Sequence, residues 1–175
     1  THTAWFYGRK EDLELARQDV AKLGFKPSKV YSRERNHSID TKYGNVKFKF
    51  TEYSFKVTAR SLISLLHAMG APLGNKANQD YSIPDWLFAL PLWQKRLYLA
   101  SLFGAELSSP KTLSGHGFNF YMPTMSVNKS LKSLDSGRRF LQDVAKLLSE
   151  FGVSSVLMDK ADEHVTKKGF TYRSR

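Results

Sequence analysis

One carboxylate stands where a bound cation would be favourable. Residues 92–106 have a helical pattern, and the segment Ser108-Ser109-Pro110 should end that helix because proline cannot continue it. Glu106 is then its last residue, where the helix dipole disfavours negative charge. A cation bound there would remove the conflict. A core helix that ends in a solvated glutamate is the other interpretation.

The second half of this helix carries a stripe of small side chains. These are Ala100, Ser101, Gly104 and Ala105, which lie on neighbouring positions one turn apart. Glycine costs a helix roughly 1 kcal/mol relative to alanine. Small residues in a row allow another backbone to come close. We therefore expect a second helix to pack against this stripe.

The same residues resemble a known motif. Residues 99–107 read LASLFGAEL and resemble the LAGLIDADG motif of homing endonucleases. Residues 83–86 and 92–96 also look like archaeal intron and intein members of that family. The matching residues are Leu99, Ala100, Leu102 and Ala105, and Glu106 falls on the acidic metal-binding position. Gly104 and Leu107 depart from the motif, replacing its first aspartate and its final glycine.

The resemblance implies a fold and an activity. The fold would be α/β (α+β), with duplicated αββαββα units and antiparallel, saddle-shaped sheets. The activity would be site-specific hydrolysis of double-stranded DNA by a homing endonuclease. Its cofactor would be Mg²⁺ (or Mn²⁺), held by Glu106 with the Ala105 carbonyl as a weaker ligand. Magnesium suits this chemistry because it polarises phosphate and activates water while needing few protein carboxylates.

Basic residues are concentrated in three segments. The chain of 175 residues has 27 Lys and Arg against 16 Asp and Glu, a net charge of +11. The whole excess lies in residues 26–60, 111–132 and 159–175, which have strand and loop patterns, whereas the helical segments are neutral. This concentration favours a positive sheet surface that faces a polyanion.

The cations of these segments are the predicted DNA contacts. Strand side chains can enter the major groove, where arginine reads guanine, while contacts to phosphate only position a protein. The sequence does not divide the residues between these two roles. The predicted DNA-binding residues are Lys29, Arg33, Arg35, Lys47, Lys49, Lys129 and Lys160.

A short sequence occurs twice. Residues 18–23 and 142–147 both read QDVAKL, each on a predicted helix that a strand follows, which indicates an internal duplication. Two further basic residues, Lys56 and Arg173, take equivalent places when the strands that contain them are aligned. The family resemblance implies a catalytic role for both, and a surface charge on a sheet is the alternative for each.

The duplication also suggests a domain organisation. Residues 1–70 would be a first repeat that lacks its opening helix, 71–91 a linker, and 92–175 a second repeat truncated at its C-terminus. The second acid of an endonuclease would then come from an upstream helix or from a second copy of the chain. We therefore expect a monomer if that helix exists and a homodimer otherwise.

Periodicity predicts the elements that position these residues. The segment from 46 to 57 alternates twice with a change of phase near residue 51, which suggests a β-bulge or a tight turn. Helices are expected at 11–23, 61–69, 92–106 and 134–151, strands at 3–7, 29–35, 46–57, 118–122, 153–158 and 169–173, and a loop at 36–45.

Composition narrows the functional classes. The chain has no cysteine, so disulfides and thiolate metal sites are excluded. No apolar run is long enough to span a bilayer, and we expect a cytoplasmic protein without a membrane partner. Double-stranded DNA is the predicted partner. The alternatives are a catalytically inactive relative that binds nucleic acid, as an intron RNA maturase or DNA-binding regulator, and a basic structural protein that binds through charge alone.

Overall fold

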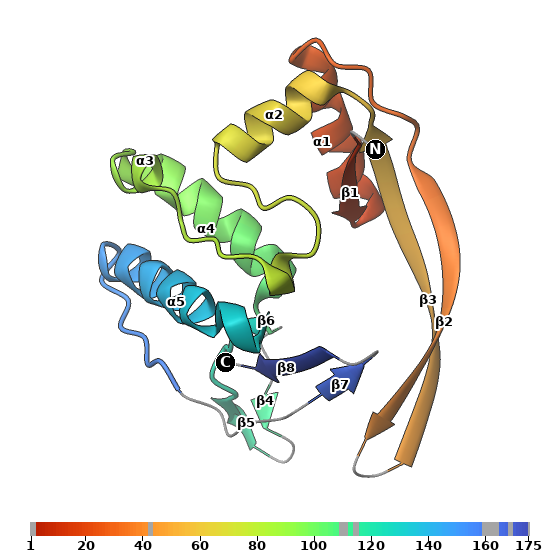
Figure 1. Cartoon of the computed structure of the whole chain (residues 1–175). Coiled ribbons are helices and arrows are strands. Elements are labelled where there is room, and N and C mark those ends of the chain that lie inside the picture. Colours follow the sequence, from red (N-terminus) through yellow and green to blue (C-terminus); the bar gives the residue numbers. More distant parts are fainter. Residues whose placement is uncertain are drawn as a thin grey trace. The chain divides into compact units, whose positions relative to one another are not determined.

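The chain forms two units, and each is described by itself. The computed structural model describes residues 3–41, 44–108, 112–113, 116–158, 165–167 and 170–174. Contacts between residues divide the chain into unit 1, Thr1–Ala68, and unit 2, Met69–Arg175. Both units contain helices and antiparallel strands (Figure 1). The prediction of a mixed α/β protein is therefore confirmed.

Unit 1 is a three-stranded antiparallel sheet with two helices. The strand order is β1-β3-β2, so the last strand of the unit is central. β2 and β3 continue as a two-stranded ribbon beyond the end of β1 (Figure 1). The elements are β1 (Ala4–Gly8), α1 (Lys10–Lys22), β2 (Tyr31–Thr41), β3 (Gly44–Val57) and α2 (Arg60–Ala68).

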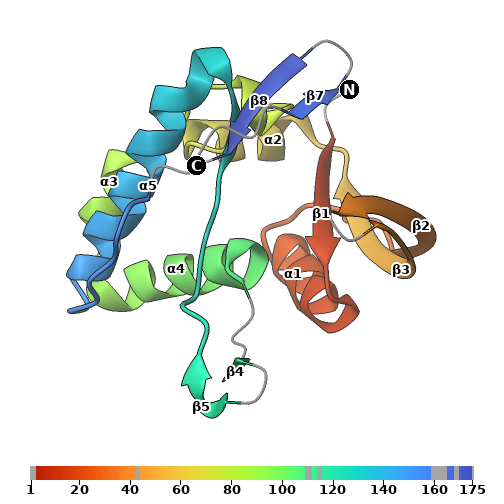
Figure 2. The same cartoon turned by 90° about the horizontal axis from the view of Figure 1, so that it is seen from below.

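The core of unit 1 lies between one face of the sheet and the helices. α1 is amphipathic, and it buries Leu13 and Val20 in the cluster that also contains Phe55 of β3. Leu62 of α2 completes this cluster. Figure 2 shows α1 lying beside β1. The opposite face of the sheet takes no part in this core.

The strands β2 and β3 differ from the prediction in two ways. Their pairing runs without a register shift from Tyr31 opposite Ser54 to Thr41 opposite Gly44, so the predicted bulge near residue 51 is absent. Most of the predicted loop at 36–45 belongs to the two strands. The alternation therefore changes phase along one unbroken strand, because its apolar side chains change from one face of the sheet to the other.

Unit 2 is built mainly from helices. It has a two-stranded sheet, β4-β5, and a three-stranded sheet of order β6-β8-β7. The elements are η1 (Lys76–Asn78), α3 (Asp85–Phe88), α4 (Leu92–Glu106), β4 (Thr112–Leu113), β5 (His116–Phe120), β6 (Asn128–Ser130), η2 (Leu131–Ser133), α5 (Leu134–Ser149), β7 (Val165–Lys167) and β8 (Phe170–Ser174).

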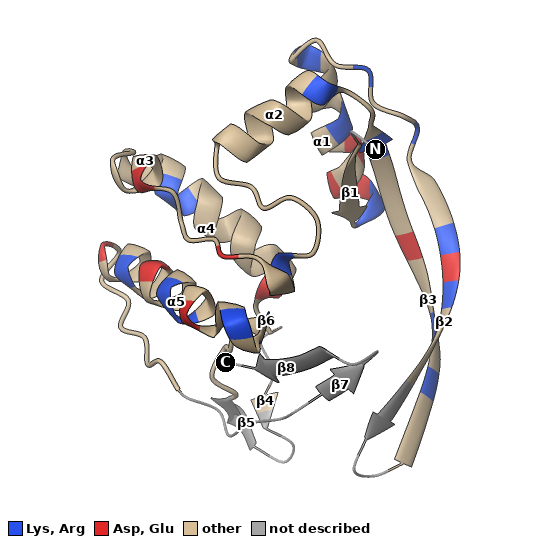
Figure 3. Cartoon of the chain, viewed as in Figure 1, with Lys and Arg blue, Asp and Glu red and all other residues tan. Residues whose placement is uncertain are grey.

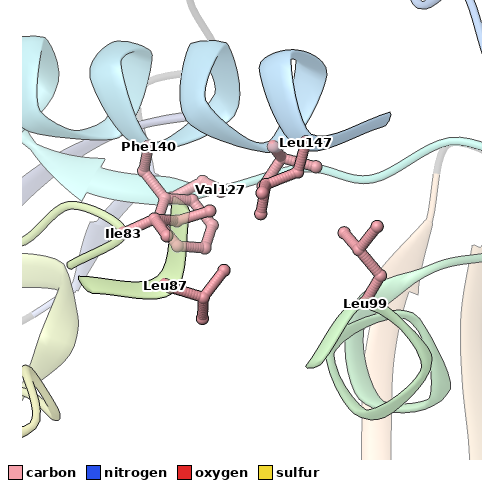
Figure 4. Packing of buried hydrophobic residues seen from close by; sticks show 7 residues of the cluster. Ile83, Leu87, Leu99, Val127, Phe140 and Leu147 are labelled. Carbon is pink, nitrogen blue, oxygen red and sulfur yellow. The ribbon is translucent and has the colours of Figure 1, made fainter. Parts of the chain in front are cut away.

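The core of unit 2 joins helices that are distant in sequence. Phe140 and Leu147 on the apolar face of α5 pack against residues of α3, α4 and the segment before β6. Figure 4 shows Ile83, Leu87 and Val127 grouped near Phe140, with Leu99 of α4 on the side of Leu147. The segment predicted as a linker thus supplies core residues. Residues 153–158, predicted as a strand, have no regular structure.

The two three-stranded sheets share a topology. In each unit a short strand leads into the helix that carries the QDVAKL sequence, and two more strands follow. The last strand is central in both sheets, as the orders β1-β3-β2 and β6-β8-β7 show. None of the helices in the described residues is long and apolar enough to cross a membrane.

Candidate nucleic-acid interface

The sheet of unit 1 has one face without a helical cover in that unit's core. Cross-strand partners lie on the same side of an antiparallel sheet, so the pairing defines this face. We call it the open face. Its side chains belong to Trp5, Tyr7, Tyr31, Arg33, Arg35, His37, Val46, Phe48, Phe50, Glu52, Ser54 and Lys56.

Large aromatic side chains are exposed on the open face. Trp5, Tyr7, Tyr31, Phe48 and Phe50 are between 40% and 59% exposed, although residues of this size are usually well buried. Trp5 stacks on Tyr7 with ring centroids 6.3 Å apart. His37 stacks on Phe48 at 5.2 Å. The face therefore presents flat rings that no described element of unit 1 covers.

Cations lie among these rings. The Lys56 ammonium is 5.6 Å from the centre of the Trp5 ring, and the Lys29 ammonium is 5.7 Å from that of Tyr31. Arg33 and Arg35 follow along β2, where Figure 3 shows Lys and Arg on both strands of the ribbon. Arg35 donates a hydrogen bond to Glu52 at 3.1 Å. Four cations against one carboxylate leave this face positive.

The two predicted lysines of β3 lie on the other side of the ribbon. Lys47 pairs with Ser38 and Lys49 with Asn36, so their side chains alternate with those of Phe48 and Phe50. Both are exposed. The ribbon thus has an aromatic side and a lysine side. The alternating pattern in the sequence does not show which of the two sides faces the core.

Glu106 ends α4, as predicted, and its negative charge is paired. Its Oε1 accepts a hydrogen bond from Lys76 Nζ at 2.7 Å, and this bond raises the pKa of Lys76. The cation at this helix end is thus a lysine from η1, which the sequence did not indicate. A metal held by Glu106 and the Ala105 carbonyl would have to displace it. The magnesium site stays a prediction, and the described residues contain no group of three His, Cys, Asp or Glu side chains that could hold a metal.

The small-residue stripe of α4 is exposed. Ala100, Ser101, Gly104 and Ala105 all face solvent in the described structure. No described atom comes within 4 Å of the position that a Cβ on Gly104 would take. The close helix contact expected from this stripe is therefore not present among the described residues.

Lys129 is buried instead of facing a phosphate. Only 1% of it is exposed, and its Nζ donates hydrogen bonds to the carbonyls of Lys76 at 2.9 Å and Gln79 at 2.6 Å. The ammonium also lies 3.8 Å from the centre of the Tyr81 ring. Burial lowers the pKa of Lys129. The prediction that it contacts DNA is wrong because the side chain fastens the segment around η1 to β6.

The remaining predicted site residues are Lys56, Arg173 and Lys160. Arg173 lies in β8, opposite Lys129, whereas Lys56 in unit 1 lies opposite the exposed Trp5. The partners of the two basic residues therefore differ in burial, and the catalytic roles of Lys56 and Arg173 stay predictions. Lys160 lies outside the described residues.

The aromatic residues of the open face were not predicted from the sequence. Trp5, Tyr7, Tyr31, Phe48 and Phe50 were not proposed as binding residues. The change of phase in residues 46–57 was the signal for them, because an unbroken strand with two apolar halves must present one half away from its own core. Only the strand pairing shows which half that is.

Comparisons with known proteins give relatives of several kinds. The tRNA-splicing ligase RtcB of Pyrococcus abyssi is 37% identical over 172 residues, which are 98% of this chain and 18% of that protein. Four further archaeal relatives carry the same ligase name. The DNA-directed RNA polymerase subunit Rpo1N of Methanocaldococcus jannaschii is 34% identical over 85% of this chain and 11% of that subunit. The replication factor C small subunit of the same organism is 28% identical over 83% of this chain and 8% of its own length.

These findings overturn several predictions. No protein-family model matches the chain, and no solved structure matches it. Five of the relatives are named as tRNA-splicing ligases, which contradicts membership of the LAGLIDADG family, DNA homing endonuclease activity and the alternative of a maturase or DNA-binding regulator. Double-stranded DNA as the partner is contradicted by the same names. Nearly the whole of this chain matches these ligases, but it spans only about a sixth of their length.

Proposed function

We propose that this chain is an RNA-binding module carried by larger archaeal proteins of nucleic-acid metabolism. The ligase, polymerase and replication-factor names of its relatives all refer to processes on nucleic acids. The ligase name, which five relatives share, refers to tRNA. RNA is therefore the first ligand class to test.

The module's contribution is expected to be separate from the reactions that its relatives are named for. The similarity covers most of this chain in proteins with three different names, but only 8–18% of the proteins described above. A segment shared by a ligase, a polymerase subunit and a replication factor supplies something that all three can use. Binding of a common type of ligand fits that requirement better than any one of their reactions.

The observation that carries the proposal is the positive, aromatic open face. Lys29, Arg33, Arg35 and Lys56 lie on or beside it, with Glu52 as the acid among its strand residues. Phosphate neutralisation by such side chains provides most of the affinity of sequence-independent binding and makes it dependent on salt. α1, on the other side of the sheet, carries three basic and four acidic residues and has no positive excess.

We also propose that the two units descend from one duplicated unit. The shared strand orders and the QDVAKL helices support this proposal. The organisation predicted from sequence, with repeats at residues 1–70 and 92–175 around the segment 71–91, is retained as part of it. The antiparallel sheet of unit 1, extended by its ribbon, is the part that we expect to contact RNA.

The test is binding of a transcribed tRNA to the whole chain, measured by fluorescence anisotropy at several salt concentrations. The double variant Arg33→Ser/Lys56→Ser removes two positive charges from the open face. We expect its affinity to fall about tenfold and its salt slope to decrease by roughly 1.4, the value for two phosphate contacts.

The matched control removes two charges elsewhere in the same unit. Lys10→Ser/Lys22→Ser changes α1, whose apolar side packs on the opposite face of the sheet, and it should bind tRNA nearly as well as the original chain. Equal losses in the two variants would show that net charge alone attracts RNA. Absence of tRNA binding at low salt would overturn the proposed function.

A further inference from the structure

The aromatic residues of the open face require an explanation beyond charge. Lysines and arginines alone suffice to hold a phosphate backbone. Phe48 and Phe50 have no polar atom to offer to a phosphate or a base edge, yet both are exposed. Exposed apolar clusters on a soluble protein commonly mark a binding surface.

The rings form a row along β3. Trp5 lies opposite Lys56, Tyr7 and Tyr31 lie on either side of Ser54, and Phe50 and Phe48 belong to β3 itself. From position 56 to position 48 the strand extends about 27 Å at its usual rise per residue. A linear ligand that follows the strand would meet rings at both ends of this row, with Arg33 between them and Arg35 opposite Phe50.

Flat rings and cations together fit unpaired bases. Aromatic side chains stack on the face of a base, which is free in single-stranded RNA and covered by neighbouring base pairs in a duplex. Any base offers such a face, so stacking tolerates many sequences. A sheet that exposes both groups can hold the backbone by charge and the bases by stacking.

We propose that the open face of unit 1 binds single-stranded RNA, with bases stacked on the rings of Trp5, Tyr7 and Tyr31 at one end of the row and on Phe48 and Phe50 at the other. This inference rests on the proposed function and narrows it to unpaired nucleotides. The row accommodates roughly four to eight nucleotides, within the site sizes of single-strand-binding sheets.

Tryptophan fluorescence tests the stacking directly. The chain has three tryptophans, and Trp86→Phe/Trp93→Phe leaves Trp5 as the only one. We would titrate this variant with an unstructured uridine-rich RNA, with an RNA duplex of equal length and with heparin. The single strand should quench Trp5 and bind at least tenfold more tightly than the duplex, and heparin should bind without comparable quenching.

A second variant tests the far end of the row. Phe48→Leu/Phe50→Leu keeps apolar side chains but removes two rings, and single-strand affinity should fall at least tenfold because stacking contributes strongly for each base. Tyr121→Leu, which removes an exposed ring from unit 2, is the control and should bind normally. Circular dichroism of each variant would verify that the fold is kept.

The outcomes separate this inference from the proposed function. Equal affinity for the single strand, the duplex and heparin, without quenching of Trp5, would overturn base stacking while leaving charge-based RNA binding intact. Absence of binding to any RNA would overturn both. Sedimentation at rising protein concentration without RNA would detect a dimer of this chain. A dimer in which Trp5 is buried would assign the aromatic row to a second copy instead.

Discussion

At the scale of single residues, burial decides what a charged side chain can do. Lys129 and Lys76 both come from segments that the sequence marks as polar or basic, yet Lys129 is buried whereas Lys76 is exposed and paired. Lys129 satisfies two backbone carbonyls inside unit 2, and Lys76 neutralises Glu106. The hydrogen bonds of buried Lys129 are worth more than the exposed Lys76–Glu106 ion pair, because water competes less for them.

The buried lysine predicts a particular pH dependence. Because burial lowers the pKa of Lys129, the unfolded chain binds more protons than the folded chain just below the ordinary lysine pKa of about 10.4. The free energy of unfolding should therefore gain a positive contribution as pH rises through that range. Lys129→Met should lose this contribution, and at neutral pH it should cost about 1–3 kcal/mol through the two carbonyls left without a donor.

Urea unfolding at a series of pH values from about pH 7 to about pH 10, below the ordinary lysine pKa, measures this effect. The stability difference between the original chain and Lys129→Met should widen with pH. Lys132→Met, at an exposed position of η2, should show no such trend. A difference that stays constant with pH would contradict the role given to burial.

At the scale of elements, the β2–β3 ribbon shows how pairing resolves an ambiguous pattern. Its apolar residues occupy one face in the half near the helices and the opposite face in the other half. A shift of register by one residue would reverse every side chain, so the pairing determines which rings are exposed. The open face depends on the whole length of the ribbon being in a single register.

Engineered disulfides would verify this register. The chain has no native cysteine, so any disulfide formed is the introduced one. Asn36→Cys/Lys49→Cys joins directly opposite residues and should oxidise readily, since facing residues lie within the Cα separation that a disulfide needs. The yield would be measured by thiol titration and mass spectrometry.

The matched pair Asn36→Cys/Lys47→Cys is displaced by two residues along β3. It should oxidise much more slowly because its Cα atoms are farther apart than a disulfide allows. Comparable oxidation of both pairs would mean that the ribbon slips by two residues, so that the rings and cations of the open face would have no single arrangement.

At the scale of the whole molecule, two separate cores imply two centres of stability. Phe55 in unit 1 and Leu147 in unit 2 are both completely buried, each in its own cluster. Neither cluster contains a residue from the other unit. Damage to one core should therefore act first on the unit that contains it.

Hydrogen exchange measured by mass spectrometry tests this division. Phe55→Ala should destabilise unit 1 by about 3–5 kcal/mol and Leu147→Ala should destabilise unit 2 by about 2–5 kcal/mol. We expect faster exchange mainly in residues 4–68 for the first variant and in 69–149 for the second, since local stability follows local packing. Equal acceleration throughout the chain in both variants would show that the units unfold as one.

The sequence by itself determined most elements and the location of the charge. Helical periodicity predicted the ends of α1, α2, α4 and α5 to within about two residues, because apolar residues recur three and four positions apart on the buried face of a helix. The confinement of positive charge to strands and loops also followed from composition. The repeated QDVAKL sequence predicted a duplication, and the two three-stranded sheets share a topology.

Only the tertiary structure decided which side chains are available. Alternation along β3 shows that two faces exist, but the partners of the strand determine which one a helix covers, so the aromatic row became visible only with the pairing. The same holds for the charges. Lys129 and Lys56 both lie in segments with a strand or loop pattern. Residues about fifty positions away enclose Lys129, whereas Lys56 lies beside the exposed ring of Trp5. Such long-range neighbours leave no periodic trace in the local sequence.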